Sequence, residues 1–203
     1  MDHRNSLIRS LVIYILGISL SLLATSQVFA KENAETPPGY LVVTGWYKDE
    51  NLKQAYYKAV APILGKYGIE AAVASHEGEN LQVIEGGWIP GRFLLIRFPS
   101  ESLVKEFWWS KEYEKAKAIR RPISALDIAQ VTGVQGVIPI MDGNTAFLVY
   151  YADITDGERF SKEYTSAFAG VTTKHGGQMI VDSPREETEL LEGALPNATL
   201  SII

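Results

Sequence analysis

The sequence predicts an α+β fold built from two tandem units with the element order β-α-β-β-α-β, the second of them incomplete. Three observations lead to this prediction. Apolar stretches of strand character alternate with stretches of helical periodicity between residues 40 and 134. Landmarks of that region recur about 107 residues further along the chain. The 203 residues, 46% hydrophobic and 21% charged, also have the composition of an ordinary globular protein with room for one or two modest cores.

Residues 1–30 have the pattern of a cleaved secretory signal peptide. Arg4 and Arg9 precede an apolar stretch over residues 11–23, and the sequence Val-Phe-Ala that ends at Ala30 suits a signal-peptidase site. The alternative is an uncleaved membrane anchor, which needs about 20 apolar residues to span the hydrocarbon. The apolar stretch is shorter than that, so we expect cleavage after Ala30, no stable membrane anchor, and a periplasmic or secreted protein.

Charge and cysteine content exclude several classes of function. Without residues 1–30 the chain has 17 basic and 23 acidic residues, and no concentrated basic stripe is present to bind nucleic acid. The chain has no cysteine, so it can form no disulfide and carry no lipid on a cysteine. Its three histidines have no metal-ligand spacing. We therefore expect no metal, no cofactor and no nucleic-acid partner.

The first unit begins after a short polar leader. Residues 31–39 include the sequence Pro-Pro-Gly, which prevents a helix before the first strand. Residues 40–47 are rich in Val, Tyr and Trp and predict a strand. Residues 51–67 have apolar side chains at helical spacing, and Gly68 is placed to end that helix as its C-cap.

Extended segments follow this helix. Residues 69–75 and 82–88 have strand character, and the turn-forming residues 77–80 separate them. Residues 93–98 form a further, strongly apolar strand, which ends at a Pro-Ser pair. We expect these segments to build the middle of the sheet.

A second helical region and a last strand complete the first unit. Ser100 is placed to cap a helix, Ser110 starts a second helical segment that runs to Arg120, and residues 125–134 return as a strand. This order defines a ferredoxin-like domain over residues 40–134, with both helices on one face of the sheet. The other face is apolar and must be buried, and a second, equivalent sheet is the simplest cover.

The second unit follows a linker at residues 135–145. Residues 147–150 (Phe-Leu-Val-Tyr) repeat residues 40–43 (Tyr-Leu-Val-Val) at a separation of 107. The Glu-Gly pair at Glu192 repeats the pair at Glu85 at the same separation. We expect Glu85 and Glu192 to stabilise turns, since the fold would make the same demand in both copies.

The partial second domain spans residues 146–203. The 107-residue spacing places the end of the sequence inside its third strand, so a second helix and a last strand have no counterpart. Either the sequence is truncated or this copy is degenerate and depends on the first. We favour truncation, because a sheet that ends there is only half covered.

Several short motifs carry a resemblance to a known family. Their order and spacing along the chain are specific. The motifs are Lys66-Tyr67-Gly68, Glu85-Gly86, Trp88-Ile89-Pro90-Gly91-Arg92, Phe98-Pro99-Ser100, Ser110, Glu112-Tyr113 and Arg120. The sequence thereby resembles the domain-of-unknown-function family thirteen-thirty, which belongs to the dimeric α/β-barrel superfamily. The resemblance implies ferredoxin-like units that pair sheet to sheet, in a homodimer or an intrachain pseudo-dimer. Because the family has no established reaction, it implies no activity.

The candidate ligand-binding residues are Arg97, Trp108 and Tyr113. Arg97 lies in an otherwise apolar strand, and arginine can hold a carboxylate with two parallel hydrogen bonds. Trp108 and its neighbour Trp109 cannot both face one core from a helix, so one of them must meet solvent, a partner or a ligand. We expect non-catalytic binding of a small anionic or aromatic molecule in the cleft between sheet and helices.

Two other functions stay open at this point. A cofactor-independent oxygenase or isomerase, of the kind found elsewhere in the superfamily, would use His76 or a tyrosine as acid or base. His76 is a weak candidate, because it also suits a solvated turn beside Glu77. An assembly module is the third possibility. If Arg97 and His76 share a cavity, chemistry is favoured; if Arg97 meets only aromatic residues, binding is favoured; if the barrel is filled, assembly is favoured.

Overall fold

The computed structural model describes residues 36–49, 52–76, 78–88, 90–140 and 144–203. The predicted signal peptide and the first part of the predicted polar leader lie outside the described residues. In the part of the chain that is described, no helix is long and apolar enough to cross a membrane.

Within the described residues, the first sheet has five strands in the order β2-β3-β1-β4-β7, and each pairs antiparallel with its neighbours. The strands are β1 (Gly39–Tyr47), β2 (Glu70–His76), β3 (Arg92–Phe98), β4 (Ser124–Thr132) and β7 (Glu189–Glu192). The helices are α3 (Lys53–Leu64), α4 (Glu101–Trp109) and α5 (Lys111–Arg120), with 3-10 turns at Gly65–Tyr67 and Arg121–Ile123. Strands β1 to β4 and these helices follow the predicted β-α-β-β-α-β order, so the α+β fold is confirmed.

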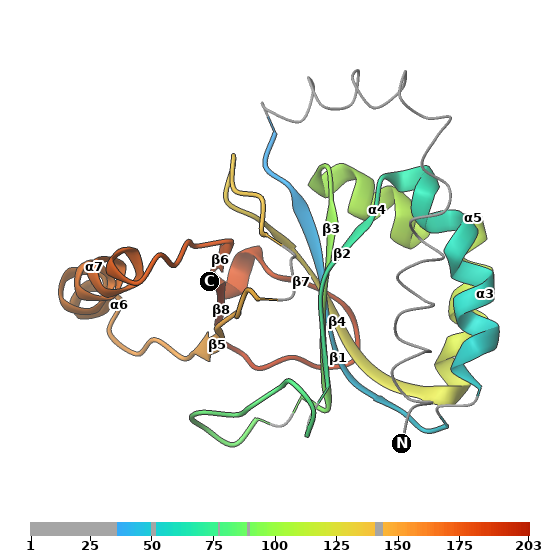
Figure 1. Ribbon diagram of the computed structural model, residues 1–203, viewed down its shortest axis with the longest axis horizontal. Coiled ribbons are helices and arrows are strands. Elements are labelled where there is room, and N and C mark those ends of the chain that lie inside the picture. The colour runs from blue at the N-terminus through green and yellow to red at the C-terminus, as the bar shows by residue number, and fades with distance from the viewer. Residues whose placement is uncertain (1–35, 50–51, 77, 89, 141–143) are drawn as a thin grey trace. The chain divides into compact units, whose positions relative to one another are not determined.

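The three helices cover one face of this sheet (Figure 1). Alternate residues of each strand point to this face, because side chains alternate along a strand. Together with residues of the helices they form one core, which includes Leu41, Tyr67, Phe98, Phe107, Trp108, Tyr113 and Ile128. Burial of this apolar surface is the main term that holds α3, α4 and α5 against the sheet.

The helix ends lie where the sequence predicts them. The Ser100 hydroxyl accepts a hydrogen bond from the Leu103 amide at 3.4 Å, and the Ser110 hydroxyl accepts one from the Tyr113 amide at 3.1 Å. Each bond satisfies an amide that the helix itself leaves without a partner. Gly68 ends the first helical region with φ of 61°, which favours glycine at this position.

The second sheet, as far as the chain is described, has three strands in the order β5-β8-β6. They are β5 (Val149–Ala152), β6 (Val181–Ser183) and β8 (Thr199–Ile202). Between β5 and β6 the chain forms α6 (Gly157–Arg159), a π-helical segment (Phe160–Thr165) and α7 (Ser166–Lys174); a 3-10 turn (Arg185–Glu187) precedes β7. The antiparallel pairings of β5 with β8 and of β8 with β6 have the same order as those of β1 with β3 and of β3 with β2.

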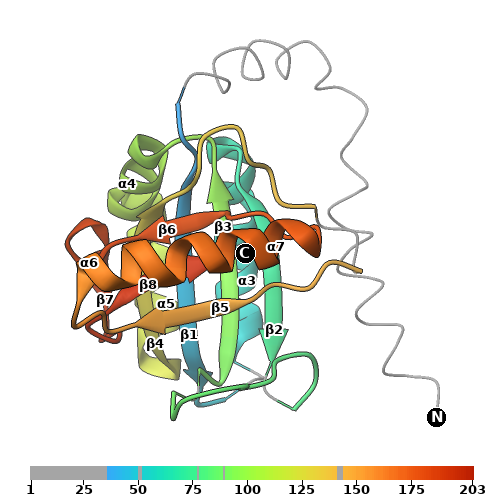
Figure 2. The same ribbon diagram turned by 90° about the vertical axis from the view of Figure 1, so that its left-hand side faces the viewer.

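The two sheets pack face to face. Their strands run crosswise to each other, and α7 lies on the outer side of the three-stranded sheet (Figure 2). A second core fills the space between them with Tyr40, Val42, Phe93, Leu95, Val131, Ile180, Val181, Leu200 and Ile202. The face of the first sheet that the helices leave bare is therefore buried by the rest of the chain.

One predicted element is wrong. Residues 82–88 belong to no strand of either sheet, and residues 82–87 are exposed. The fifth strand of the first sheet is instead β7, which pairs with β4 from more than fifty residues away. Strand character in a short segment does not reveal whether a neighbouring strand is present to pair with it, and this explains the error.

Candidate functional site

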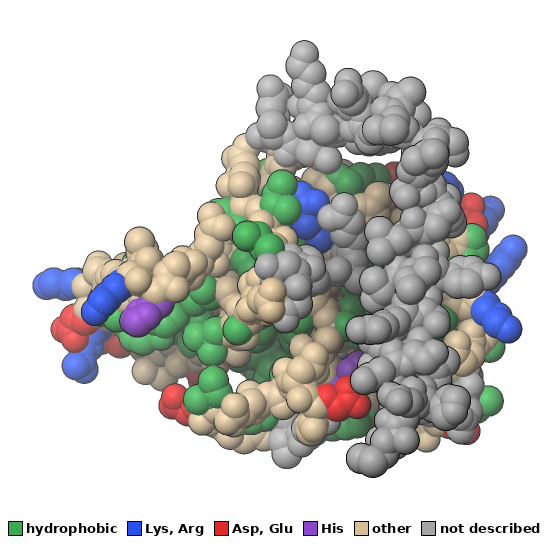
Figure 3. All heavy atoms as spheres, viewed as in Figure 1, with side chains coloured by type: hydrophobic (Ala, Val, Ile, Leu, Met, Phe, Trp, Pro, Cys, Tyr) green, Lys and Arg blue, Asp and Glu red, His purple; other side chains and the backbone are tan. Residues whose placement is uncertain are grey.

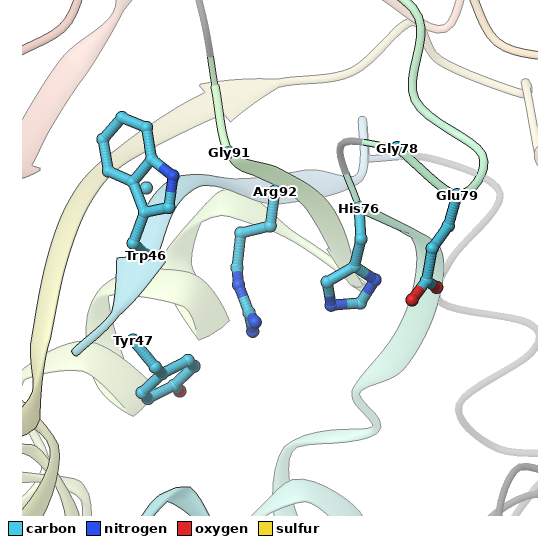
Figure 4. A pocket seen from close by; sticks show the side chains of 8 residues that line it. Trp46, Tyr47, His76, Gly78, Glu79, Gly91 and Arg92 are labelled. Atoms are coloured by element: carbon cyan, nitrogen blue, oxygen red, sulfur yellow. The ribbon is translucent and has the colours of Figure 1, made fainter. Parts of the chain in front are cut away.

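An open hollow of about 410 Å³ lies at one end of the first sheet. It is formed where β1 and β2 end and where β3 begins (Figure 4). Its lining residues are Gly45, Trp46, Tyr47, His76, Gly78, Glu79, Gly91 and Arg92. The hollow thus combines aromatic rings with an arginine, a histidine and a glutamate.

The sheet register places His76 beside Arg92. These two residues are cross-strand partners of β2 and β3, so their side chains leave the sheet on the same face. Figure 4 shows the Arg92 side chain between those of Tyr47 and His76. The guanidinium carbon of Arg92 lies 4.6 Å from the centre of the Tyr47 ring, a cation–π contact that holds the charge in place.

A tight turn fixes the His76 side of the hollow. The Asn80 side chain accepts a hydrogen bond from the His76 amide at 2.9 Å and donates one to the Ala74 carbonyl at 3.4 Å. Gly78, within this turn, has φ of 78°. The turn carries Glu79 to the rim of the hollow, where its carboxylate lies near the histidine (Figure 4).

Two glycines shape the Trp46 side of the hollow. Gly45 has φ of 111°, its amide donates to the Pro90 carbonyl at 2.7 Å, and a Cβ here would overlap the Ala125 carbonyl. A Cβ on Gly91 would overlap the Trp46 indole. The indole therefore packs on the backbone of Gly91, while 52% of Trp46 stays exposed as a wall of the hollow.

Tyr47 is a neutral phenol in this site. Burial raises the pKa of its phenol well above the ordinary value, and the neighbouring Tyr56 and Tyr57 raise it further, while Arg92 and Arg120 lower it only in part. A phenol with a raised pKa stays protonated at neutral pH. Tyr47 is therefore unsuited to act as a base.

A buried ion pair lies between the first unit and β7. The Arg120 guanidinium donates to both carboxylate oxygens of Glu192, at 2.8 and 2.7 Å, and Arg120 is only 1% exposed. The Arg121 Nε also donates to Glu192, at 3.4 Å. Nearby, the hydroxyls of Tyr56 and Tyr113 are hydrogen-bonded at 3.3 Å. This bidentate geometry fixes the end of α5 to the end of β7.

The turn role expected for Glu192 is wrong. Its carboxylate binds Arg120, and the turn that follows β7 is held by Asp127, whose Oδ1 accepts a hydrogen bond from the Ala194 amide at 2.7 Å. An arginine 72 residues away in sequence could not be identified as its partner from the Glu-Gly motif alone.

The ion pair predicts an acid-sensitive fold. Burial alone would raise the pKa of Glu192, but the hydrogen bonds and charge of Arg120 outweigh it and hold that pKa below the ordinary 4.5. The contribution of Glu192 is therefore complete above its unfolded pKa and is lost as pH falls through the lower folded pKa. We expect the free energy of unfolding, measured with urea, to decrease from about pH 5 to about pH 3, and to decrease less in Glu192→Gln. The exposed control Glu187→Gln should keep the parent's slope; equal slopes in Glu192→Gln and the parent would contradict the assignment.

The structure does not bring Arg97, Trp108 and Tyr113 together. Trp108 and Tyr113 are buried in the core beneath the helices. Arg97 alternates with residues of that core and lies on the opposite face of β3, where it interacts with Tyr40. The cleft between sheet and helices is thus filled by Trp108 and Tyr113 themselves.

Arg97 is also remote from His76. Its register partners lie at one end of β3, and His76 pairs with Arg92 at the other. Five residues of strand separate the two arginines by about 16 Å. The arrangement in which Arg97 and His76 share a cavity, which would favour chemistry, is therefore not present.

The two adjacent tryptophans divide as expected. Trp108 is buried, whereas Trp109 is 67% exposed. The buried Lys117 lies against both rings, with its Nζ 4.5 Å from the Trp108 ring and 5.3 Å from the Trp109 ring. Its Nζ also donates to the Trp108 carbonyl and pairs with Glu114. This cluster caps the end of α4 and has a structural role.

Among the described residues, no group of three or more His, Asp or Glu side chains is placed to hold a metal ion. The sequence marks His76 as a candidate but does not link it to Trp46 and Arg92, which line the same hollow. One signal could have found them. His76 ends one strand and Arg92 begins the next, so a hairpin-like pairing of these strands would set the two side chains side by side.

The chain is similar to one described family and to two solved structures. Residues 38–134 match the family described as Domain of unknown function (DUF1330). A solved protein of unknown function from Rhodopseudomonas palustris has a TM-score of 0.39 and 13% identity, over 56% of this chain and 94% of that one. A methylated form of it has a TM-score of 0.35 and 15% identity, over 54% and 92% of the two chains. No curated protein matches the chain.

Proposed function

We propose that the unit formed by residues 38–134 binds a small carboxylate in the hollow at the end of its sheet, without catalysing a reaction. The observation that carries the proposal is the placement of Arg92 and His76 as register partners on one face, with the guanidinium of Arg92 stacked on Tyr47. Two nitrogen-bearing side chains that point to one side can both donate hydrogen bonds to one anion.

The shape of the hollow supports a ligand with one charged end and one ring. A volume of about 410 Å³ lies in the range of ordinary small-molecule sites. Arginine binds a carboxylate with a planar pair of hydrogen bonds. Tyr47 supplies aromatic surface on the side of the sheet to which Arg92 and His76 point, and Trp46 lines the hollow from the other side of β1 (Figure 4). Glu79 on the rim adds a negative charge, which restricts the number of negative charges that a ligand can bring.

The test is an isothermal calorimetric titration of the chain from Lys31 onward with benzoate, an aromatic carboxylate. We expect benzoate to bind and benzamide, its neutral analogue of similar shape, to bind at least about tenfold more weakly, because only the carboxylate makes charge-assisted bonds. Arg92→Ala should weaken benzoate binding by at least about tenfold. Glu79→Gln should strengthen it, because a like charge is removed.

The matched control is Arg185→Ala, which removes the same charge from an exposed arginine outside the lining of the hollow. It should leave the benzoate affinity unchanged. Equal losses in Arg92→Ala and Arg185→Ala, or equal binding of benzoate and benzamide, would contradict the proposed site.

We also propose that residues 146–203 are an incomplete second copy of the first unit, so that one chain forms a pseudo-dimeric α/β barrel. The shared order of β5-β8-β6 and β1-β3-β2 and the core between the sheets support this arrangement. At the 107-residue spacing, Trp46, Tyr47 and Arg92 correspond to Asp153, Ile154 and Thr199. Residues that the fold requires would recur in both copies, so their absence from the second copy supports a ligand-binding role in the first.

The export of the protein is part of the same proposal. The charged, apolar and small-residue segments of residues 1–30 support removal of a signal peptide and a mature chain that starts at Lys31, in the periplasm or outside the cell. The intact mass of the protein from its producing cells would show this start directly.

A further inference from the structure

The exposed segment Gln82–Glu85, named here the arm, has a counterpart in β7. At the 107-residue spacing the arm corresponds to Glu189–Glu192, and both segments have a polar residue, two apolar residues and a glutamate. Each is followed by a glycine of positive φ: 82° for Gly86 and 75° for Gly193. The two segments thus share sequence pattern and backbone turn, yet only one of them belongs to a sheet.

Strand β7 holds a helix and a strand of the first unit in place. It pairs antiparallel with β4, whose other edge pairs with β1. Glu192 at its end binds the Arg120 guanidinium at the end of α5. A four-residue segment therefore adds a strand to the edge of β4 and a buried ion pair to the preceding helix.

The arm has the same groups but no such neighbour in the described structure. Ile84 is 77% exposed and Val83 is 43% exposed, which is unusual for two successive β-branched residues. Glu85 is also exposed. The arm thus has two apolar residues followed by a glutamate, in the same order as Leu190, Leu191 and Glu192 of β7.

The loop that carries the arm meets the outer strand of the second sheet through Trp88. Trp88, which follows the arm, packs on Tyr151 of β5, with ring centres 4.8 Å apart. Among the described strands, β8 is the one neighbour of β5, so β5 is an edge strand of this sheet. Hydrophobic side chains gather at the surface between α6–α7 and the loop that carries the arm (Figure 3). Exposed strand edges with apolar surface around them are places where a further strand pairs.

We propose that the arm and the outer edge of β5 together accept a helix–strand segment of the α5–β4 kind. Its strand would pair with β5 on one edge, as β4 pairs with β1, and with the arm on the other, as β4 pairs with β7. The helix before this strand would end in an arginine, which binds Glu85. The inference rests on the proposed second copy of the unit and is independent of carboxylate binding in the hollow.

Charge and continuity with the existing interface decide the nature of the occupant. Glu192, which ends β7, is bound by Arg120. Glu85 ends the arm in the same way, so an arginine is the expected partner of its carboxylate. A strand between the arm and β5 would also continue an existing sheet, in which each backbone amide and carbonyl finds a partner. The occupant is therefore a helix–strand segment with an arginine at the end of its helix, as in α5 and β4.

The experiment supplies this segment in register. A copy of residues 97–134 is joined after Ile203, which stands 107 residues after Ile96. Hydrogen exchange is then compared in the chain from Lys31 with and without the extension. We expect amides of residues 82–85 and 149–152 to exchange at least about tenfold more slowly with the extension, because strand pairing protects them.

Two variants test the role of Glu85. Glu85→Gln in the extended chain, or Arg120→Gln in the appended copy alone, should remove most of the protection gained by residues 82–85. Amides of β1 report that the first unit is folded in every variant. Unchanged exchange at residues 82–85 in the extended chain, with β1 still protected, would overturn the proposal. Benzoate titration of the same proteins measures ligand affinity in the hollow separately, so failure of one proposal does not imply failure of the other.

Discussion

Glu192→Leu is expected to destabilise the fold by about 3–5 kcal/mol, because it leaves the guanidinium of Arg120 buried without a counter-charge. Arg120 is only 1% exposed, and both of its terminal nitrogens donate to Glu192. The same change releases β7 from α5 and so loosens the fifth strand of the first sheet. Urea denaturation of the chain from Lys31 at neutral pH measures the loss.

The double variant Arg120→Met with Glu192→Leu separates the ion pair from the packing around it. Replacement of both partners by apolar residues removes the buried charge, so the double variant should recover most of the stability. The control Glu187→Leu changes an exposed glutamate in the turn before β7 and should stay within about 0.5 kcal/mol of the parent. A single variant Glu192→Leu as stable as the parent would mean that the ion pair does not hold the sheet together.

Trp108→Ala is expected to cost about 3–5 kcal/mol of stability and to leave the affinity for benzoate unchanged. The Trp108 ring is buried in the helix-side core against Tyr113, with ring centres 5.5 Å apart, and against the ammonium group of Lys117. Its removal would open a large cavity there. Thermal unfolding and benzoate calorimetry of the same protein measure the two effects.

Trp109→Ala provides the matched control for this prediction. The neighbouring ring is largely exposed, so its removal should change stability by no more than about 0.5 kcal/mol. A Trp108→Ala protein that stays folded but loses benzoate binding would contradict the assignment of the site to the hollow. It would return the ligand to the cleft between sheet and helices.

The sequence was sufficient to predict most of the first unit. Helix periodicity, the caps at Ser100 and Ser110 and the glycine at position 68 are local signals, and each depends on a few neighbouring residues. The bare apolar face of the first sheet also required a cover, and the second sheet provides it. Local chemistry and the need to bury apolar surface together determined these features.

The site and the fifth strand could not be predicted in the same way. Arg97 and Arg92 lie on one strand, and only the register and the pleat decide that Arg97 faces Tyr40 while Arg92 faces His76. The pairing of Arg120 with Glu192 joins residues 72 positions apart. No local sequence pattern indicates this pairing, because it depends on how the sheet assembles.

Native mass spectrometry of the protein purified gently from its producing cells tests the central claim most directly. The claim is that the hollow lined by Trp46, His76 and Arg92 binds a small carboxylate. We expect the chain to carry a small acid, which is lost in Arg92→Ala and retained in Arg185→Ala. A chain with no bound molecule even after addition of benzoate, or a bound molecule that Arg92→Ala retains, would contradict it.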